Sequence, residues 1–358
     1  MKFIHIADVH LGMKPDRNKP WGKERTQAIR DSFAKVIEQA NVLDVDCLFI
    51  SGDLFHHQPL FQDLKEVDAL FSTIPQVQVV LIAGSHDWIR PNSALLSFTW
   101  SSNVTFLMSE QISSVFFDRL NLEVHGFSYH AEEITAPVLR DLQVPKDSRI
   151  HVLLAYGSDT THLPLETSRL AHAGFSYMAL GQLHKPELAA DFSYAYPGSL
   201  EPLSQTETGR HGMIVGEIDP RTGQTSSLEF VPLAHTQYIP LVVHVTPATT
   251  NKELIERITD AIETRGVQNI YRFRICGLRN SDNHFDLTPL TNHFRIVEVV
   301  DESEPQYDFY QLFTEHPSDM IGFYIQAFPK EAPTPVEKKA LCYGMEALLH
   351  TIDERSDS

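Results

Sequence analysis

The sequence feature that most constrains the fold is an apolar segment ending in Gly52 and Asp53, within the run LFISGDLFHH at residues 48–57. Apolar or small residues lead directly into the glycine, which is typical of a buried strand followed by a sharp turn. In an open α/β sheet, ligands bind in the crevice beyond the C-terminal ends of the strands. The segment therefore predicts a strand that delivers a carboxylate to a site, and Asp53 is our candidate for the central metal ligand.

The same arrangement occurs before and after this segment. A strand predicted near the N-terminus ends at Asp8 and His10, and positions i and i+2 of an extended chain point to the same side. Another strand, at residues 77–83, runs into the sequence GSHD at residues 84–87. A single Asp-x-His pair is more often a helix-capping aspartate with an incidental histidine. Three successive strand–helix units that each end in Asp or His favour a functional site instead.

Two later apolar segments are expected to end at the same rim of the fold. Residues 152–155 run into Tyr156, and residues 177–180 run into the sequence GQLH at residues 181–184. Because these strand ends also carry polar residues, we expect His184 to lie beside Asp8 and Asp53.

Length and composition indicate a soluble globular protein with one large and one smaller domain. The chain has 358 residues, of which 42% are hydrophobic and 21% charged. No apolar run approaches the roughly eighteen residues of a membrane span, and the N-terminus lacks the zones of a signal peptide. The three cysteines are widely separated, as expected for free thiols in a reducing compartment. We therefore predict a cytoplasmic protein with no membrane association.

The charge balance argues against a nucleic-acid partner when it is considered alone. The sequence holds 29 Lys and Arg against 47 Asp and Glu, a formal net charge of −18. Binding to phosphate backbones is largely electrostatic, so an acidic chain needs a local basic surface to bind DNA.

We place the end of the first domain near residue 235. A smaller α+β domain is predicted over residues 236–330, because strand and helix patterns resume after Pro240. Residues 331–358 are predicted to form a linker and a C-terminal helix.

Three expectations concern this C-terminal part. Arg272 and Arg274 alternate with apolar residues in a predicted strand and share one face, which is either a solvated face or a contact to phosphate backbone. The acidic stretch at residues 301–304 is expected to be a loop in solvent. The final helix is expected to carry its apolar residues on one side: Val336, Ala340, Tyr343, Ala347 and Leu348.

The strand-end motifs, in this order, resemble those of calcineurin-like metallophosphoesterases, in the SbcD-type DNA repair exonuclease branch. The resemblance covers nearly the whole chain and includes the sequence YPGS at residues 196–199 and a capping domain. It implies an α/β fold with a β-sandwich flanked by helices, and two Mn²⁺ ions bridged by Asp53. It also implies that His86 lies outside the metals and acts on the phosphate or the leaving group, with Asp87 orienting it. His56 is a further candidate for substrate binding.

The chain departs from the family pattern at one of the two metal positions. The resemblance assigns one ion to Asp8, His10, Asp53 and His184, and all four are present. In the family, an asparagine and two histidines bind only the other ion. In this chain Ser85, Tyr156 and Gln182 occupy those three positions. The expectation is therefore one firmly bound Mn²⁺ and a second that is weak or absent. His151, Asp159 and His162 are alternative ligands only if the loop around Gly157 turns them inward.

Two functions from different classes follow. The first is a metal-dependent phosphodiesterase that acts on DNA ends in repair. The second is a weak or inactive family member that serves as a DNA-end binding or scaffold subunit. A small-nucleotide phosphodiesterase is a third and lesser alternative, since a capping domain implies an extended substrate. The resemblance also implies an SbcC-type coiled-coil ATPase as a partner, docked through the C-terminal helix, and a homodimer is a further expectation.

Overall fold

The computed structural model describes residues 1–158, 163–328 and 334–356. These residues form two compact units, Met1–Tyr238 and Ile239–Ser358. Each unit has its own hydrophobic core.

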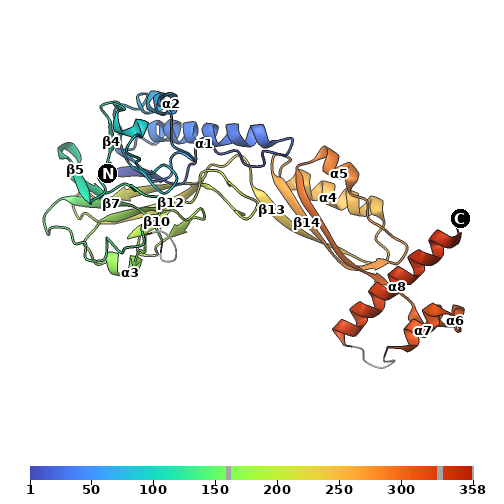
Figure 1. Ribbon diagram of the computed structural model, residues 1–358. Coiled ribbons are helices and arrows are strands. Elements are labelled where there is room, and N and C mark those ends of the chain that lie inside the picture. The colour runs from blue at the N-terminus through green and yellow to red at the C-terminus, as the bar shows by residue number, and fades with distance from the viewer. Residues whose placement is uncertain (159–162, 329–333, 357–358) are drawn as a thin grey trace. The chain divides into compact units, whose positions relative to one another are not determined.

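The N-terminal unit contains two six-stranded sheets, and the first of these holds the predicted strands around Asp8 and Asp53 (Figure 1). Its central strands are parallel, and the last two strands form the antiparallel hairpin that closes the unit. In spatial order the strands are β12 (Thr225–Pro232), β11 (Gly212–Ile218), β1 (Lys2–Ile6), β2 (Cys47–Ser51), β3 (Gln78–Ile82) and β4 (Val104–Phe106).

The second sheet contains the predicted strands that lead to Tyr156 and to His184. Its core strands β6, β7, β8 and β10 are parallel, and β5 and β9 are antiparallel edge strands. In spatial order the strands are β5 (Ser113–Phe117), β6 (Leu122–Gly126), β7 (Ile150–Tyr156), β8 (Tyr177–Gly181), β10 (Tyr194–Tyr196) and β9 (Glu187–Leu188). A short helix, α3 (Thr167–Leu170), precedes β8.

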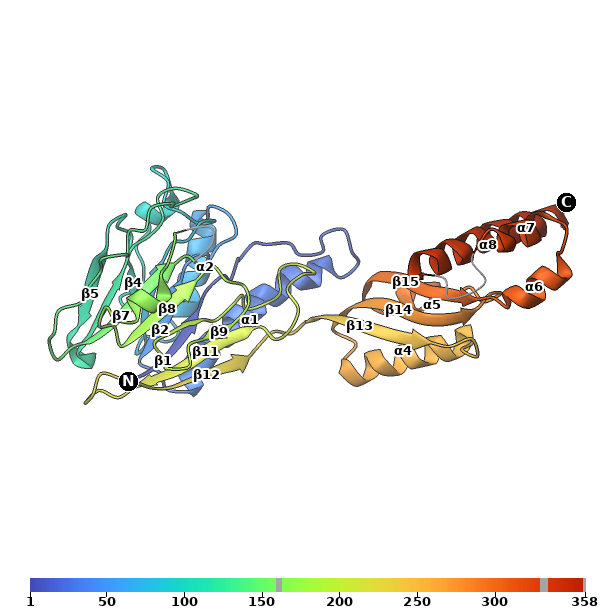
Figure 2. The same cartoon turned by 90° about the horizontal axis from the view of Figure 1, so that it is seen from below.

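The two sheets pack face to face, and helices cover the first sheet on its outer side (Figures 1 and 2). Phe3 of β1 lies against Tyr177 of β8, with ring centroids 4.7 Å apart, inside the core shared by the sheets. The opposite face of β1 packs against α1 (Gly22–Val42), which lies beside α2 (Phe61–Phe71). Strands buried on both faces must be apolar throughout, which explains their continuous hydrophobic runs.

The C-terminal unit is a three-stranded sheet with helices. The sheet order is β13 (Tyr238–Val245), β14 (Ile270–Asn280) and β15 (Ile296–Gln306). Thr250 caps α4 by accepting a hydrogen bond from the Glu253 amide, as the sequence predicts. The helices are α4 (Asn251–Arg265), α5 (Thr288–His293), α6 (Phe309–Glu315), α7 (Met320–Gln326) and α8 (Pro335–Ser356).

Two expectations for this unit were wrong. The acidic stretch lies in strand β15, where Asp301 and Glu302 pair with β14. Arginines on the neighbouring strand explain this, since opposite charges across a strand pair offset the low strand propensity of acidic residues. The apolar side of α8 was also misassigned: Leu341 and Met345 are buried, whereas Val336 is 78% and Tyr343 61% exposed.

The predicted fold class is confirmed: an α/β sandwich flanked by helices, followed by a smaller α+β unit. Within the described residues, no helix has both the length and the hydropathy of a membrane span. Cys47, Cys276 and Cys342 are free thiols.

Candidate metal centre

The loops that follow β1 and β2 are joined to each other by backbone hydrogen bonds. The Asp8 amide donates to the Gly52 carbonyl at 3.1 Å, and the His10 amide donates to the Asp53 carbonyl at 3.0 Å. These bonds continue the parallel pairing of the two strands beyond their ends. They hold the side chains of Asp8, His10 and Asp53 at one edge of the sheet.

The backbone at this edge is strained. Asp8, His10 and Asp53 have φ angles of 50°, 52° and 49°, and Gln182 has a φ of 101°. Residues other than glycine rarely adopt this left-handed region, and each instance costs on the order of 1 kcal/mol. Such strain tends to collect at functional sites, so its concentration here agrees with the predicted role of the loops.

The four predicted ligands of one ion lie together. His10 Nε2 is 3.7 Å from Asp53 Oδ2 and 4.0 Å from Asp8 Oδ1, and His184 Nε2 is 3.7 Å from the same Asp8 oxygen. Asp8, His10 and Asp53 are buried. The arrangement draws on the ends of β1, β2 and β8, which are far apart in the sequence.

Two of these predicted ligand atoms lack a hydrogen-bond partner among the described residues. Asp8 Oδ1 and His10 Nε2 are buried, and neither has a hydrogen bond to any described residue. Leaving a buried polar atom unsatisfied costs about 1–3 kcal/mol, so such atoms are uncommon. A cation between them would satisfy both, and a set of two carboxylates and two imidazoles suits Mn²⁺, Fe²⁺ or Zn²⁺.

The buried charged groups of this cluster are electrostatically unfavourable on their own. Burial raises the pKa of Asp8 to about 6, despite the opposing effect of His184. Burial, followed by repulsion from Asp87 and Asp8, raises the pKa of Asp53 well above its usual range. Burial also holds the pKa of His10 well below its usual value. Neutral imidazole beside carboxylates that repel one another is a setting in which a divalent cation is stabilising.

Glu207 is a part of the site that the sequence motifs did not reveal. Its Oε1 lies 3.1 Å from His184 Nδ1, and its Oε2 accepts hydrogen bonds from Ser199 Oγ and the Leu203 amide. Burial acts to lower the pKa of His184, but the bond to Glu207 and the Asp8 carboxylate outweigh it and raise the pKa to about 9. Glu207 therefore fixes the ring so that Nε2 faces Asp8, as carboxylates behind metal-binding histidines commonly do.

The residues at the altered metal position form a hydrogen-bonded group around Asp53. Tyr156 Oη donates to Asp53 Oδ2 at 2.6 Å, and Ser85 Oγ lies 3.4 Å from that oxygen and 3.3 Å from the phenol. Burial raises the pKa of Tyr156 well above its usual value, so the phenol keeps its proton. Gly84 makes room here, because a Cβ at that position would lie 2.4 Å from Asp53 Oδ1.

The positions of Gln182 and of the alternative ligands differ from those of Ser85 and Tyr156. The Gln182 amide donates to Asp8 Oδ2 at 2.9 Å, so its backbone orients a carboxylate. The condition set for His151 as an alternative ligand is not met: it lies at the start of β7, five residues and about 16 Å of strand from Tyr156, and it bonds to His125 and Asp147. Asp159 and His162 lie outside the described residues.

His86 and His56 stack at the edge of the cluster, with ring centroids 4.9 Å apart. His86 Nδ1 lies 3.1 Å from the His56 carbonyl, and the His86 ring is exposed. Asp87, predicted to orient His86, accepts backbone hydrogen bonds from Phe55 and Gly84 instead. This geometry favours a structural role for Asp87, which ties the loops after β2 and β3 together.

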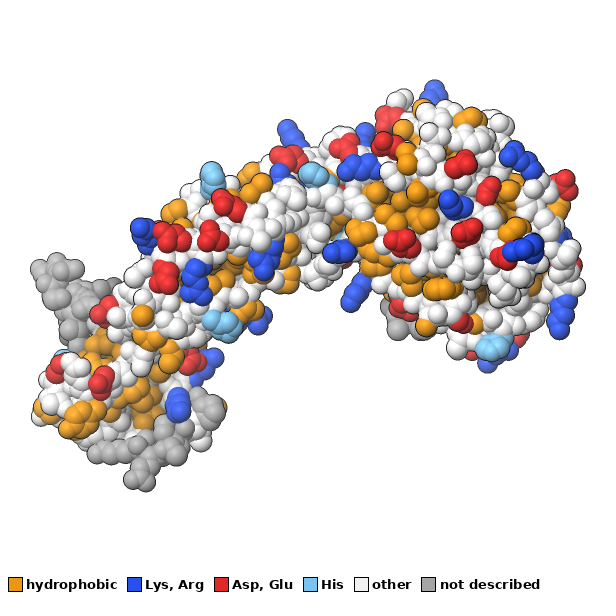
Figure 3. Space-filling model, turned by 180° about the vertical axis from the view of Figure 1, so that it is seen from behind, with side chains coloured by type: hydrophobic (Ala, Val, Ile, Leu, Met, Phe, Trp, Pro, Cys, Tyr) orange, Lys and Arg blue, Asp and Glu red, His pale blue; other side chains and the backbone are white. Residues whose placement is uncertain are grey.

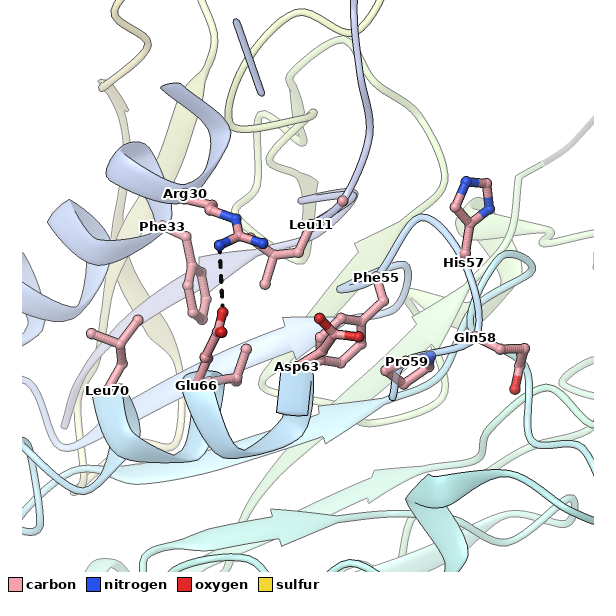
Figure 4. A pocket seen from close by; sticks show the side chains of 12 residues that line it. Leu11, Arg30, Phe33, Phe55, His57, Gln58, Pro59, Asp63, Glu66 and Leu70 are labelled. Atoms are coloured by element: carbon pink, nitrogen blue, oxygen red, sulfur yellow. Dashed lines mark hydrogen bonds and ion pairs between the residues drawn. The ribbon is translucent and has the colours of Figure 1, made fainter. Parts of the chain in front are cut away.

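Two open grooves meet at His56 and His57. One, of about 580 Å³, is lined by His86, Trp88 and Arg90, and the other, of about 730 Å³, by the loop 12–19 with its basic residues. A separate cavity of about 200 Å³ lies between α1 and α2, lined largely by apolar side chains and bordered by the Arg30–Glu66 ion pair (Figure 4). The grooves, unlike this cavity, are lined by His56, whose Nδ1 lies 3.2 Å from Nδ1 of the predicted ligand His10.

Arg272 and Arg274 lie in the C-terminal unit and are exposed on β14. Arg272 Nε is 2.6 Å from Glu298, and Arg274 Nε is 3.6 Å from Glu302. These pairs offset the positive charge of the strand face that was considered for phosphate contact.

Residues 1–194 match the family described as calcineurin-like phosphoesterase, which is more than half of the chain. The chain belongs to this family. As a calcineurin-like phosphoesterase, it is expected to bind divalent metal and to hydrolyse phosphoesters, and the predicted family is confirmed.

Several curated proteins resemble this calcineurin-like phosphoesterase. A DNA double-strand break repair protein Mre11 of Methanopyrus kandleri is 26% identical over 72% of this chain and 62% of its own length. The Aeropyrum pernix protein of that name is 30% identical over 59% of this chain and 56% of its own length. An uncharacterized metallophosphoesterase of Bacillus subtilis, YhaO, is 25% identical over 73% of this chain and 67% of its own length. The matches thus span less than two thirds of the two Mre11 proteins.

Glu207→Gln is expected to weaken Mn²⁺ binding by about 10- to 100-fold, because His184 loses the charged partner that orients it and increases its basicity. Isothermal titration of the purified chain with Mn²⁺ measures this. Glu187→Gln, which removes an exposed carboxylate from nearby β9, is the matched control and should bind as the parent does. Equal affinities for all three proteins would contradict the role assigned to Glu207.

Proposed function

We propose that this protein is a divalent-metal-dependent phosphodiesterase that acts on DNA ends, with one principal cation held by Asp8, His10, Asp53 and His184. The observation that carries the proposal is the convergence of Asp8 Oδ1 and His10 Nε2, both buried and both without a hydrogen bond to the described residues. A bound Mn²⁺ would offset the charge of the phosphodiester and make water more acidic.

The protein's own residues would orient the metal ligands and act on the substrate. Asp53, held by the His86 amide at Oδ1, and His184, held by Glu207, keep their ligand atoms in place before substrate arrives. His86 is exposed at the groove and is the group we assign to contact the phosphate or to protonate the leaving oxygen. His56 stacks beside it, and burial lowers its pKa to about 4, so its ring is neutral at pH 7.

DNA as the substrate is supported by the named relatives and by the loop 12–19, which places Lys14, Arg17 and Lys19 in a groove that includes His56. On the face drawn in Figure 3, Lys and Arg side chains are scattered among Asp and Glu and are not gathered in one patch. A short basic groove beside the catalytic residues fits a DNA end better than a long duplex, because few phosphates would be neutralised.

A second candidate function is that of a weakly active scaffold. It is favoured by the Tyr156 hydroxyl, which donates to the Asp53 oxygen that a second cation would need. In this case DNA-end binding would persist while hydrolysis would be slow.

The test is cleavage of end-labelled linear DNA, supercoiled plasmid and bis-p-nitrophenyl phosphate in a Mn²⁺ series. Asp53→Asn should reduce cleavage of linear DNA by about 10³-fold or more, since it weakens the metal position proposed for catalysis. Asp31→Asn, on the exposed face of α1, is the matched control. Hydrolysis of the small ester without DNA cleavage would favour a small-nucleotide enzyme, and DNA-end binding without hydrolysis at any Mn²⁺ concentration would favour the scaffold.

We also propose an SbcC-type coiled-coil ATPase as the partner, contacted through α7 and α8. These helices pack on each other, yet Phe323 of α7 and Tyr343 of α8 remain exposed. Exposed apolar side chains on adjacent helices often mark an interaction surface.

Combined Phe323→Ser and Tyr343→Ser substitution is expected to reduce co-purification with the ATPase by about tenfold or more, since two aromatic contacts would be lost. Leu96→Ser, at an exposed position of the N-terminal unit, is the control and should co-purify normally. Undiminished co-purification of the double variant would remove this surface as the contact.

A further inference from the structure

A second group of histidines and carboxylates lies in the N-terminal unit, at the start of β7 and on the neighbouring strand β6. Glu123 and His125 lie on β6, and His151 lies on β7 beside Glu123 in the strand register. In a parallel pair these three side chains project from one face of the sheet. The group is separated from the candidate metal centre by about 16 Å along β7.

The ligand atoms of this group converge. His125 Nε2 and His151 Nδ1 are 3.0 Å apart, Glu123 Oε2 is 3.9 Å from His151 Nδ1, and all three atoms lie within 4.8 Å of one another. Glu123 Oε1 accepts a hydrogen bond from Ser114 Oγ. Glu123 Oε2 is buried and accepts no hydrogen bond from the described residues, although Arg149 Nη1 lies 2.5 Å away.

The protonation of the two rings suits metal binding. Asp147 Oδ1 lies 3.0 Å from His151 Nε2, which places the ring proton there and leaves a lone pair on Nδ1. Burial lowers the pKa of His125, so its imidazole is neutral at pH 7. Without a cation, His125 Nε2 and His151 Nδ1 share one proton across their 3.0 Å contact. When His125 adopts its other neutral tautomer, with the proton on Nδ1, its Nε2 carries a lone pair. A cation can then bind between the two nitrogens in place of the proton.

We propose that Glu123, His125 and His151 bind a zinc-like divalent cation, with Asp147 as the residue that orients His151. Two imidazoles and one carboxylate leave the fourth position of a tetrahedron to water. Zinc–nitrogen bonds of about 2.0–2.1 Å require the two nitrogens to be about 3.3 Å apart, which is a small change from 3.0 Å. Imidazole ligands favour Zn²⁺ over Mn²⁺, which is why Zn²⁺ is the ion proposed for this group.

Arg149 sets the balance between the metal-free and metal-bound states. It lies against Glu123 and is also paired with Asp147. A cation bound by Glu123 must displace this guanidinium, whose positive charge opposes it. Removal of the Arg149 charge therefore favours metal binding, whereas removal of either histidine abolishes it. These opposite directions separate the proposal from a general loss of folding.

The test uses the full chain, stripped with chelator, incubated with Zn²⁺ and passed through gel filtration before elemental analysis. His125→Ala and His151→Ala should each retain one zinc per chain fewer than the parent. Arg149→Gln should bind Zn²⁺ at this position severalfold more tightly. The control is His172→Ala, an exposed histidine outside the group, which should match the parent.

Co²⁺ supplies an independent readout, because four-coordinate Co²⁺ absorbs strongly in visible light. The parent and Arg149→Gln should show this absorption, and both histidine variants should lose the part that corresponds to one Co²⁺ per chain while circular dichroism shows them folded. Equal zinc content in parent and histidine variants, or weaker zinc binding by Arg149→Gln, would overturn the proposal. The proposal stands apart from the phosphodiesterase function, since neither readout depends on catalysis.

Discussion

The combined substitution Ser85→Asn, Tyr156→His and Gln182→His is expected to add a second Mn²⁺ and to raise the rate of phosphodiester cleavage by about 10²-fold or more. Tyr156 donates its hydroxyl to Asp53 Oδ2, and its replacement would make that oxygen available to a second ion. A second ion that stabilises developing charge contributes several kcal/mol to the barrier, and each 1.4 kcal/mol or so is tenfold in rate. Metal content and the rate of DNA cleavage are measured together.

Tyr156→Phe is the matched control for this triple variant. It removes the hydroxyl that occupies Asp53 but supplies no ligand, so it should bind one ion and gain little activity. The three substitutions must be combined, because ligands of one ion do not act additively. A triple variant that binds two Mn²⁺ and cleaves no faster would show that the altered position does not limit catalysis.

Arg25→Met is expected to destabilise the N-terminal unit by about 3–5 kcal/mol, a large fraction of the stability of a typical domain. Arg25 of α1 is fully buried, and its Nη1 donates to Glu201 Oε2 at 2.7 Å. Its loss leaves the Glu201 carboxylate buried without its counter-charge. Denaturant unfolding followed by circular dichroism measures the change as a lower transition midpoint.

The same helix provides the control. Arg30 pairs with Glu66 at 3.4 Å, and both side chains are about half exposed. Such exposed pairs contribute at most about 1 kcal/mol, so Arg30→Met should leave the midpoint nearly unchanged. The double variant Arg25→Met with Glu201→Leu should recover part of the loss, because no uncompensated charge remains. Equal midpoints for Arg25→Met and Arg30→Met would contradict this account.

Much of the first sheet could be predicted, because β1, β2 and β3 are buried on both faces and read as continuous apolar runs. The places of Asp8, His10 and Asp53 followed from the same rule, since each comes at the end of such a strand. The roles of these residues in binding metal stay predictions. Glu207 could not be found this way: it lies 23 residues beyond His184, away from any strand end, and only the tertiary fold brings it to the ring.

The directions in which side chains point could not be predicted from the sequence either. The motif order placed Tyr156 at the rim but could not show that its hydroxyl reaches Asp53. Asp87 follows His86 directly, yet its carboxylate turns toward the amides of Phe55 and Gly84. In α8, several apolar residues could have formed the buried face, and the fold buries Leu341 and Met345. Each of these choices depends on neighbours that are distant in sequence.

The left-handed backbone at Asp8, His10 and Asp53 has a consequence for attempts to improve this protein in the laboratory. Glycine adopts that conformation without steric cost, so replacing any of these residues by glycine relieves about 1 kcal/mol of strain while removing a predicted metal ligand. Directed evolution that screens for heat resistance alone will therefore be drawn toward variants whose centre is empty. Screens that couple heat resistance to metal retention avoid this path.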